Sequence, residues 1–263
     1  MEVTAGKKIY FLSDFHLGAP DHATSLFREK KIVAFLDEIK KNAAAIFIVG
    51  DVFDFWFEYK HVVPKGYVRL LGKLAEITDS GIPVSFFIGN HDMWMRGYFE
   101  QELNIPVFYE PQEYIFNGLK FFIGHGDGLG PGDHGYKMLK KLFRNRFCQR
   151  MFGMLHPSWG IGLANYFSRQ SRKKTGTTDE HFLGEEKEWL MIFSREVLAK
   201  QHVDYFIFGH RHIPIYQPLT ENSRYINLGD WIKYFSYAVF DGRKVELKYW
   251  EASTPPTPKG EKE

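Results

Sequence analysis

Short apolar runs typical of buried β-strands recur along this 263-residue chain, and a group of polar, metal-binding residue types directly follows each of them. The runs are Ile9–Leu12, Ala45–Val49, Phe86–Ile88, Phe121–Ile123 and Phe206–Phe208. Between the first three runs, apolar residues recur at helical spacing, which predicts helices over about residues 32–41 and 67–78. This β-α-β-α-β order is typical of one half of a doubly wound α/β fold.

The C-terminal part of the chain has a different pattern. Short β runs are predicted at residues 225–227, 236–240 and 245–249, and Asp241-Gly242 is typical of a hairpin turn between the last two. Together the two patterns predict an α/β protein with two packed sheets flanked by helices. The segment 252–263 is rich in Pro, Lys and Glu and is predicted to be a disordered tail.

Five polar clusters follow the predicted strands, where ligands of open α/β sheets gather. They are Asp14-Phe15-His16, Gly50-Asp51 with Asp54, Gly89-Asn90-His91-Asp92, Gly124-His125-Gly126-Asp127 and Gly209-His210-Arg211-His212. Bringing so many carboxylates and imidazoles together is costly unless a cation compensates them. The mixed nitrogen and oxygen donors suit Mn, Fe, Zn or Co better than Ca or Mg alone. No cluster contains cysteine, which argues against a structural zinc site.

These clusters match, in order, the motifs DxH, GDxxD, GNHD, GHG and GHxH, and the chain therefore resembles the calcineurin-like metallophosphoesterase superfamily over residues 8–230. The resemblance implies a four-layer α-β-β-α fold and two divalent ions, with Mn²⁺ expected and Fe, Zn or Co as alternatives. Such a pair of ions activates water and holds the phosphoryl oxygens during hydrolysis. The implied ligands of the first ion are Asp14, His16, Asp51 and His212, and those of the second are Asp51, Asn90, His125 and His210, so that Asp51 bridges.

The resemblance also implies catalytic roles within the third cluster. Asn90 and His91 would contact the phosphate or the leaving group, and Asp92 would orient the imidazole of His91. The alternative is that His91 only packs the turn.

The segment 134–178 is basic and apolar at once. Between Tyr136 and Thr178 there are ten Lys or Arg residues and no Asp or Glu. The first predicted helix has cations on one face (Lys137, Lys140, Lys141 and Arg144) and apolar residues on another (Leu139, Leu142 and Phe143). Gly153 and Pro157 separate it from a second predicted helix. We therefore expect a core formed by residues 1–133 and 179–251, with 134–178 inserted as a helical cap.

Three interpretations of this segment remain open. It could be an ordinary helical hairpin with solvated charges, or a nucleic-acid surface, as in a metal-dependent nuclease. The formal net charge is only +2 and no Gly-rich aromatic sheet motif accompanies the segment, so no nucleic-acid partner is expected. We favour an amphipathic cap that contacts an anionic membrane surface or an acyl-chain substrate.

The place of the insertion, between the GHG and GHxH motifs, is similar to that in the UDP-2,3-diacylglucosamine pyrophosphohydrolase family of lipid A biosynthesis. The stretches from Ser168 to Lys174 and from Asn227 to Trp231 are also similar to that family, although many members have Arg where this chain has His91. The resemblance implies hydrolysis of a lipid-linked nucleotide diphosphate, UDP-2,3-diacylglucosamine, to UMP and 2,3-diacylglucosamine 1-phosphate. Substrate contacts are expected from seven cap residues, namely Phe143, Phe147, Trp159, Arg169, Ser171, Arg172 and Lys173.

Two other classes of function are weighed against this one. The first is a different phosphodiesterase, phosphatase or nuclease on the same core. The second is a non-catalytic scaffold, which the intact set of ligand residues argues against.

The remaining features bear on location. The single Cys148 is consistent with a reducing compartment. No apolar run approaches the roughly 18 residues of a membrane span, and no signal peptide is predicted. A cytoplasmic enzyme, peripheral on the inner face of the bacterial inner membrane, is expected.

Overall fold

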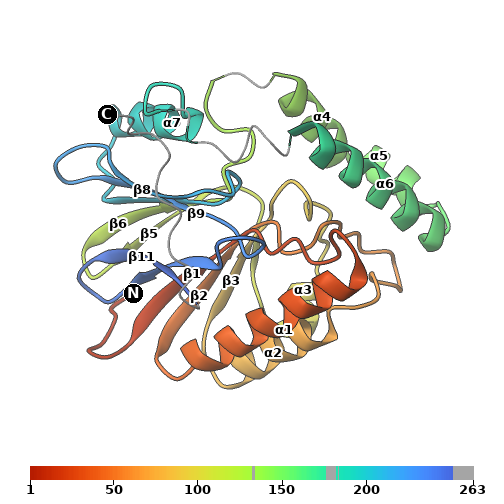
Figure 1. The fold of residues 1–263 in the computed structure, drawn as a ribbon, viewed down its shortest axis with the longest axis horizontal. Coiled ribbons are helices and arrows are strands. Elements are labelled where there is room, and N and C mark those ends of the chain that lie inside the picture. The colour runs from red at the N-terminus through yellow and green to blue at the C-terminus, as the bar shows by residue number, and fades with distance from the viewer. Residues whose placement is uncertain (132–133, 176–181, 183, 251–263) are drawn as a thin grey trace.

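The computed structural model describes residues 1–131, 134–175, 182 and 184–250 (Figure 1). The predicted tail at 252–263 and the predicted boundary between cap and core near 178 lie outside the described residues. The strands are β1 (Lys8–Leu12), β2 (Ala43–Val49), β3 (Val84–Phe87), β4 (Val107–Phe108), β5 (Gln112–Phe116), β6 (Leu119–Ile123), β7 (Tyr205–Phe208), β8 (Pro214–Pro218), β9 (Arg224–Leu228), β10 (Ser236–Phe240) and β11 (Val245–Tyr249). The helices are α1 (His22–Ile39), α2 (Val68–Asp79), α3 (Tyr98–Leu103), α4 (His134–Arg144), α5 (Arg146–Gly153), α6 (Pro157–Thr175) and α7 (Trp189–Leu198).

The strands form two mixed sheets. A six-stranded sheet has the order β11-β10-β1-β2-β3-β4, and a five-stranded sheet has the order β5-β6-β7-β9-β8. Strands β1 to β4 run parallel in the first sheet, and β6, β7 and β9 run parallel in the second. The carboxyl ends of the parallel strands in each sheet therefore meet at one edge, and the five polar clusters follow these ends.

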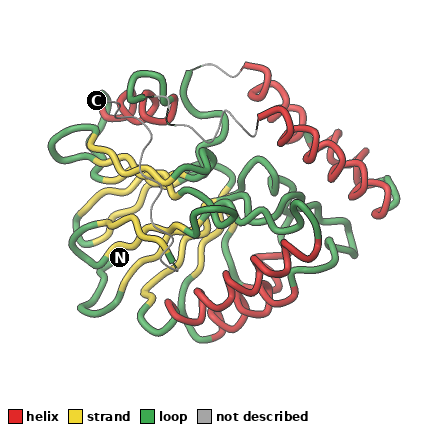
Figure 2. The backbone as a smooth tube through the Cα atoms, viewed as in Figure 1, coloured by secondary structure: helices red, strands yellow, loops and turns green. Residues whose placement is uncertain are grey.

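The molecule has four layers, as Figure 2 shows by colour. Alternate residues of β1 face opposite sides, because Tyr10 and Leu12 pack toward α1 and α2 while Ile9 and Phe11 pack between the two sheets. A third apolar cluster lies between the second sheet and α7, centred on Leu190. The predicted arrangement of two packed sheets flanked by helices is confirmed.

Helix α1 begins ten residues before the predicted start, because Asp21 caps it: its carboxylate accepts a hydrogen bond from Thr24 N at 2.9 Å. Helix α2 begins at Val68, and the preceding residue, Tyr67, caps it with no side-chain hydrogen bond. The buried carboxylate of Glu29, on α1, accepts from Arg69 N at 2.9 Å instead, so the two helices on this face are joined through a charge at a helix N-terminus.

Helices α4, α5 and α6 project beyond the edge of the four layers (Figure 1). The single helix predicted before Gly153 is in fact two, because the side chain of Asn145 accepts from Phe147 N and Cys148 N and starts a new helix, α5. We call α4 to α6 the cap. None of the helices in the described ranges combines the length and the apolar character that crossing a bilayer would require.

Candidate dimetal site

The polar clusters converge because main-chain hydrogen bonds tie the loops after the parallel strands to one another. Asp14 N, after β1, donates to Gly50 O, after β2, at 3.0 Å. Gly209 N, after β7, donates to His125 O, after β6, at 3.0 Å. His210 N then donates to the Asp14 carboxylate at 3.1 Å, which joins the loops of the two sheets.

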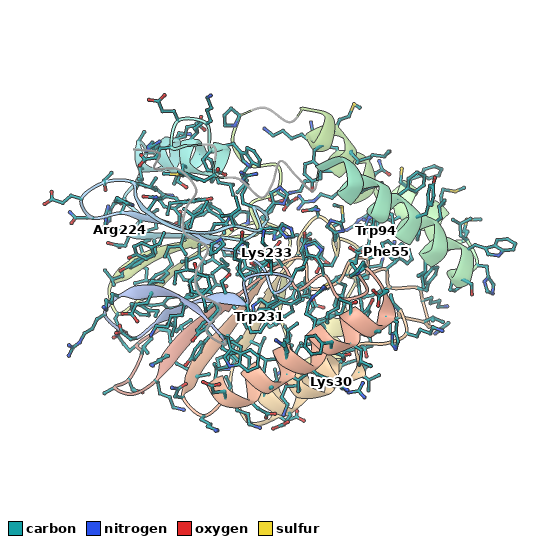
Figure 3. All side chains as sticks on the ribbon, viewed as in Figure 1. Lys30, Phe55, Trp94, Arg224, Trp231 and Lys233 are labelled. Atoms are coloured by element: carbon teal, nitrogen blue, oxygen red, sulfur yellow. The ribbon has the colours of Figure 1, made fainter. Side chains whose placement is uncertain are left out.

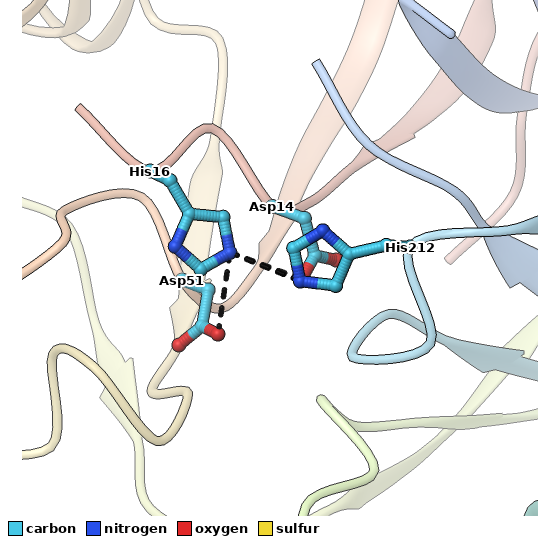
Figure 4. A group of neighbouring side chains, drawn as sticks. All are labelled: Asp14, His16, Asp51 and His212. Atoms are coloured by element: carbon cyan, nitrogen blue, oxygen red, sulfur yellow. Dashed lines mark hydrogen bonds and ion pairs between the residues drawn. The ribbon is translucent and has the colours of Figure 1, made fainter. Parts of the chain in front are cut away.

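One group of donor atoms is formed by Asp14, His16, Asp51 and His212 (Figure 4). The Nε2 atoms of His16 and His212 lie 3.2 Å apart, and both face Asp14 Oδ1, at 3.7 and 3.5 Å. Asp51 Oδ2 lies 3.6 Å from His16 Nε2. All four atoms lie within 4.8 Å of one another, as atoms that share one cation must.

A second group contains Asp51, His125 and His210, with Asn90 among them. Asp51 Oδ2 lies 3.3 Å from His125 Nε2, and Asn90 Oδ1 lies 3.3 Å from that nitrogen and 2.9 Å from His210 Nδ1. The same oxygen of Asp51 therefore faces both groups, which is the geometry expected of a bridging ligand.

Hydrogen bonding suits these side chains to metal binding. His125 Nδ1 lies 2.8 Å from Val49 O, and because a carbonyl only accepts, Nδ1 carries the proton and Nε2 is left as the donor atom for a metal. Asp14 Oδ1 is buried without a hydrogen-bond partner. A buried carboxylate oxygen of this kind is costly unless a cation neutralises it. The donor set thus fits a pair of divalent ions.

The electrostatics of the cluster favour a cation at the same place. Burial acts to raise the pKa of the Asp51 carboxyl, but the charge of His125 and its hydrogen bond to Asp51 outweigh this and hold the pKa well below its usual range. Burial acts to lower the pKa of His125, yet the Asp51 carboxylate raises it to about 10. The negative potential that holds a proton on His125 is the potential that attracts a divalent ion, so metal binding is expected to release protons.

The ligand loops also hold strained backbone. Five of the predicted ligand residues have positive φ, a conformation uncommon for residues with a side chain. Their values are 57° (Asp14), 43° (His16), 52° (Asp51), 71° (His210) and 53° (His212). Such strain persists only when the surroundings over-determine it, and it concentrates at functional sites.

The Asp92 carboxylate was expected to orient the His91 imidazole, but its hydrogen bonds go to main-chain N–H groups. The carboxylate accepts from Gly89 N at 2.7 Å and from Val52 N at 2.8 Å, so it braces the second and third motif loops against each other. His91 Nδ1 instead faces Asp54 O at 3.0 Å. Burial lowers the pKa of His91 to about 4, so its imidazole is neutral at pH 7. The predicted orientation of His91 by Asp92 is therefore wrong.

Four further residues support the site, and the sequence analysis gave none of them a role. Arg28, buried on α1, donates to the main-chain oxygens of Phe15, His16 and Ala19 and so fixes the first motif loop. Asp230, after β9, lies 3.4 Å from His212 Nδ1. The other two are Asp54 and Ser168. An arginine ten or more residues beyond DxH has no motif of its own, whereas Asp54 ends GDxxD and could have been found.

Ser168 brings the cap to the site. From α6, its Oγ lies 3.1 Å from the Asp54 carboxylate and 3.3 Å from His91 Nδ1. Asp54 itself lies 3.9 Å from His16 Nδ1, on the side away from the other ligands. The last cap helix therefore borders the histidine expected to contact phosphate.

Aromatic side chains of the core contact the cap, among them Trp94, which Figure 3 labels. Trp94 Nε1 donates to Phe143 O at 2.7 Å, and the Trp94 ring lies 5.4 Å from Phe143 and 4.8 Å from Phe152. Phe147 and Trp159, by contrast, are 69% and 75% exposed. Of the three apolar residues expected to contact acyl chains, Phe143 is therefore packed on the core and two face outward. The side chains of Arg169, Ser171, Arg172 and Lys173 lie outside the described part of the structure.

Cations of α4 also hold the cap to the core. Lys140 pairs with the Asp127 carboxylate at 2.5 Å, and Lys137 Nζ donates to Gly130 O. Arg144 pairs with Glu110 and donates to Tyr109 O. Three of the four α4 cations that the favoured interpretation places at an anionic surface therefore bind the core, and exposed Lys141 projects from the helix. The name "cap anchors" is used below for Lys137, Lys140 and Arg144.

Comparisons with known proteins agree with this geometry. The family model described as calcineurin-like phosphoesterase matches residues 7–214. A Porphyromonas gingivalis protein named UDP-2,3-diacylglucosamine hydrolase is 40% identical over 256 residues, which cover 93% of this chain and 98% of that protein. Proteins of the same name from Histophilus somni and Shewanella putrefaciens are 27% and 26% identical, over 86% and 90% of this chain and 92% and 95% of theirs.

Proposed function

Because this chain belongs to the calcineurin-like phosphoesterase family, we propose that it uses two divalent ions to hydrolyse the diphosphate of UDP-2,3-diacylglucosamine to UMP and 2,3-diacylglucosamine 1-phosphate. The observation that carries the proposal is the position of Asp51 Oδ2, 3.6 Å from His16 Nε2 and 3.3 Å from His125 Nε2. A carboxylate shared by two donor groups serves two ions, and two-ion sites suit in-line displacement at phosphorus. The name and 40% identity of the Porphyromonas relative support the choice of substrate.

Two sets of residues would hold the ions, which we propose to be Mn²⁺. Asp14, His16, Asp51 and His212 would hold one, and Asp51, Asn90, His125 and His210 the other. When bound, the ions would activate water and neutralise charge on the phosphoryl oxygens. In this hydrolysis, the oxygen of water would form a bond to the uridine-side phosphorus. The bond from that phosphorus to the bridging oxygen would break, and the bridging oxygen would leave with the sugar phosphate.

His91 would act as a hydrogen-bond donor to phosphate. Its Nδ1 faces Asp54 O, which only accepts, so the single proton of the neutral imidazole is held there and Nε2 must gain a second proton before it can donate. A phosphate anion beside the ring favours this protonated form, and the hydrogen bond from Nε2 strengthens as charge develops on the oxygen. Asp92 would contribute indirectly, by bracing the loop from which Asn90 and His91 project.

We further propose that residues 134–178 form the cap that receives the acyl chains, and that residues 1–133 and 179–251 form the catalytic core. Ser168 supports this, because it brings α6 within hydrogen-bond distance of His91. The cations Arg169, Arg172 and Lys173, together with Ser171, would then neutralise or bind the second phosphate. Phe143 is proposed to close the inner end of the acyl site, beside Trp94.

The exposed apolar residues of the cap support a peripheral position on the membrane. Phe147, Met151, Met154 and Trp159 are each at least half exposed, and exposed Arg146 and Arg150 lie on α5 with the first two. Apolar side chains beside cations suit an anionic bilayer surface. We propose that α5 and the start of α6 touch the inner leaflet of the bacterial inner membrane from the cytoplasmic side, which is where a lipid substrate resides. Phe147 and Trp159 would then contact lipid around the substrate.

A substrate panel with added Mn²⁺ tests the function. UDP-2,3-diacylglucosamine, UDP-N-acetylglucosamine, bis(p-nitrophenyl) phosphate and single-stranded DNA are compared by kcat/KM. Each enclosed methylene contributes roughly 0.8 kcal/mol, so the diacylated substrate should be preferred by orders of magnitude. Equal hydrolysis of UDP-N-acetylglucosamine would refute the lipid assignment. Faster hydrolysis of DNA would point to a nuclease, and no hydrolysis of any substrate would point to a scaffold.

A further inference from the structure

The loop between β7 and β8 holds two proposed metal ligands in strained backbone. His210 and His212 have φ of 71° and 53°. A non-glycine residue in such a conformation is strained and needs surroundings that keep it there. The hydrogen bond from His210 N to the Asp14 carboxylate holds one side of this loop. Arg211, the residue between the two histidines, holds the other side of the loop.

Arg211 is fully buried. Its Nε donates to Glu188 Oε1 at 2.6 Å and its Nη2 donates to Glu188 Oε2 at 3.3 Å, and both side chains are 0% exposed. The guanidinium also lies 4.4 Å above the ring of Trp189. A planar fork that meets a carboxylate at two points fixes orientation as well as distance.

The segment that carries Glu188 also touches the loop of a third histidine ligand. Gly126, next to His125, has a φ of +110°, and a Cβ there would lie 3.0 Å from Leu190 Cδ1. Gly130 has a φ of +78°, and a Cβ there would lie 2.5 Å from Trp189 O. The start of α7 thus packs against the loops of all three histidines that follow β6 and β7.

We propose that Arg211 and Glu188 are positioning residues, which set the directions of His210 and His212 from the start of α7 and so determine how tightly the two ions are held. The inference rests on the proposed metal centre. It assigns a role to the variable position of the GHxH motif and to a glutamate 23 residues away in the sequence. Buried ion pairs are not in themselves evidence of stabilisation, so a positioning role is separable from a stabilising one.

The experiment removes the pair without leaving a buried charge. Arg211→Met and Glu188→Leu are combined, because replacing a buried pair by apolar residues of similar size is often neutral for stability. The matched control is Arg195→Met with Glu185→Leu, which removes another Arg–Glu pair at α7 whose members are 39% and 50% exposed. Mn²⁺ affinity of the chelator-treated full chain is measured by calorimetry, and the melting temperature and circular dichroism report the fold.

A positioning role predicts a folded double variant with Mn²⁺ affinity lowered about 10- to 100-fold, the range typical of residues that orient metal ligands. The control pair should leave the affinity within about twofold. Arg211→Lys keeps the positive charge but loses the planar, two-point contact with Glu188, so it should also weaken Mn²⁺ binding. This single variant serves as the test if the double variant does not fold. Parent-like affinity in the folded double variant, or in Arg211→Lys where the double variant does not fold, would overturn the inference.

The same measurement separates this inference from the substrate assignment. Mn²⁺ affinity does not depend on which phosphoester is hydrolysed. The Mn²⁺ measurement therefore still tests the positioning role if UDP-2,3-diacylglucosamine is not hydrolysed. A parent protein that binds no Mn²⁺ would overturn both the metal centre and the positioning role.

Discussion

The metal-ligand loops and the cap are held in place by different kinds of contact. In the loops, buried polar side chains bond to the main chain, as His125 does to Val49 and Arg28 does to His16. The cap rests on the aromatic contact between Trp94 and Phe143 and on the cap anchors, while much of its apolar surface faces outward. A site that must hold cations needs fixed donor atoms, whereas a surface for acyl chains and lipid needs apolar area. Substitutions in the two regions should therefore affect different steps.

The largest effect is expected at the shared ligand. Asp51→Asn removes a charge that faces both donor groups, so hydrolysis of every substrate should fall by on the order of 10³-fold or more. Elemental analysis should show bound metal falling together with activity. Full metal occupancy in this variant would contradict the bridging role of Asp51.

His91→Ala tests chemistry without removing a metal ligand. Loss of a hydrogen bond to the reacting phosphate should lower kcat by about 10²–10⁴-fold. Bound metal should stay at the parent level, because His91 Nδ1 faces Asp54 O rather than either donor group. An unchanged kcat would leave His91 with only a packing role.

Trp94→Ala tests whether the seat of the cap governs substrate preference. It removes the ring that contacts both Phe143 and Phe152. We expect kcat/KM for UDP-2,3-diacylglucosamine to fall about 10- to 100-fold, since a displaced cap encloses fewer methylenes. Hydrolysis of bis(p-nitrophenyl) phosphate should change less than about threefold. An equal loss for both substrates would show that cap and core are not separable, and Tyr216→Ala, at an exposed position on β8, provides the control for a lost aromatic side chain.

The pH dependence of stability should report His91 in metal-free protein. Its pKa of about 4 in the folded chain lies below the ordinary value of 6.5, so the unfolded chain binds more protons between these values. Stability from this group is complete above pH 6.5 and is lost as the pH falls toward 4. His91→Gln should reduce that loss by roughly 1–3 kcal/mol, measured by urea unfolding at several pH values. Parallel pH profiles in parent and variant would contradict the lowered pKa.

The smallest effect per substituted residue is expected at the outer face of the cap. Replacing exposed Lys141, Arg146 and Arg150 by Gln should weaken binding to anionic liposomes, measured by sedimentation, by about 1 kcal/mol per charge. Rising salt should release the parent protein from these liposomes. The control replaces exposed Lys7, Lys41 and Lys200, which precede β1, β2 and β7 at the amino ends of these strands, opposite the edge where the polar clusters lie. Equal binding to neutral and anionic vesicles would argue against an electrostatic membrane contact.

The meeting of the polar clusters was predictable, because each motif directly follows a strand whose apolar run is visible in the sequence and parallel strands end at one edge. The assignment of Asp14, Asp51 and His125 as ligands came from the resemblance to the metallophosphoesterases and stays a prediction. Asp92 was assigned a different partner, since adjacency to His91 in the sequence does not fix where a carboxylate points. The core contacts of the α4 cations, which were expected at an anionic surface, could not be predicted for a related reason: Lys140 meets Asp127 only when the chain folds back after β6.

The sequence by itself determined the two packed sheets, the order of the clusters and the chemistry of the donors, since periodicity and residue type are local properties. Only the tertiary structure decided that Ser168 reaches His91, that Arg28 holds the first loop and that Glu188 meets Arg211. These contacts join residues 12 to 77 positions apart, and no local pattern records them. They depend on how helices α1, α6 and α7 pack against the strand ends, which is fixed by burial summed over the whole molecule.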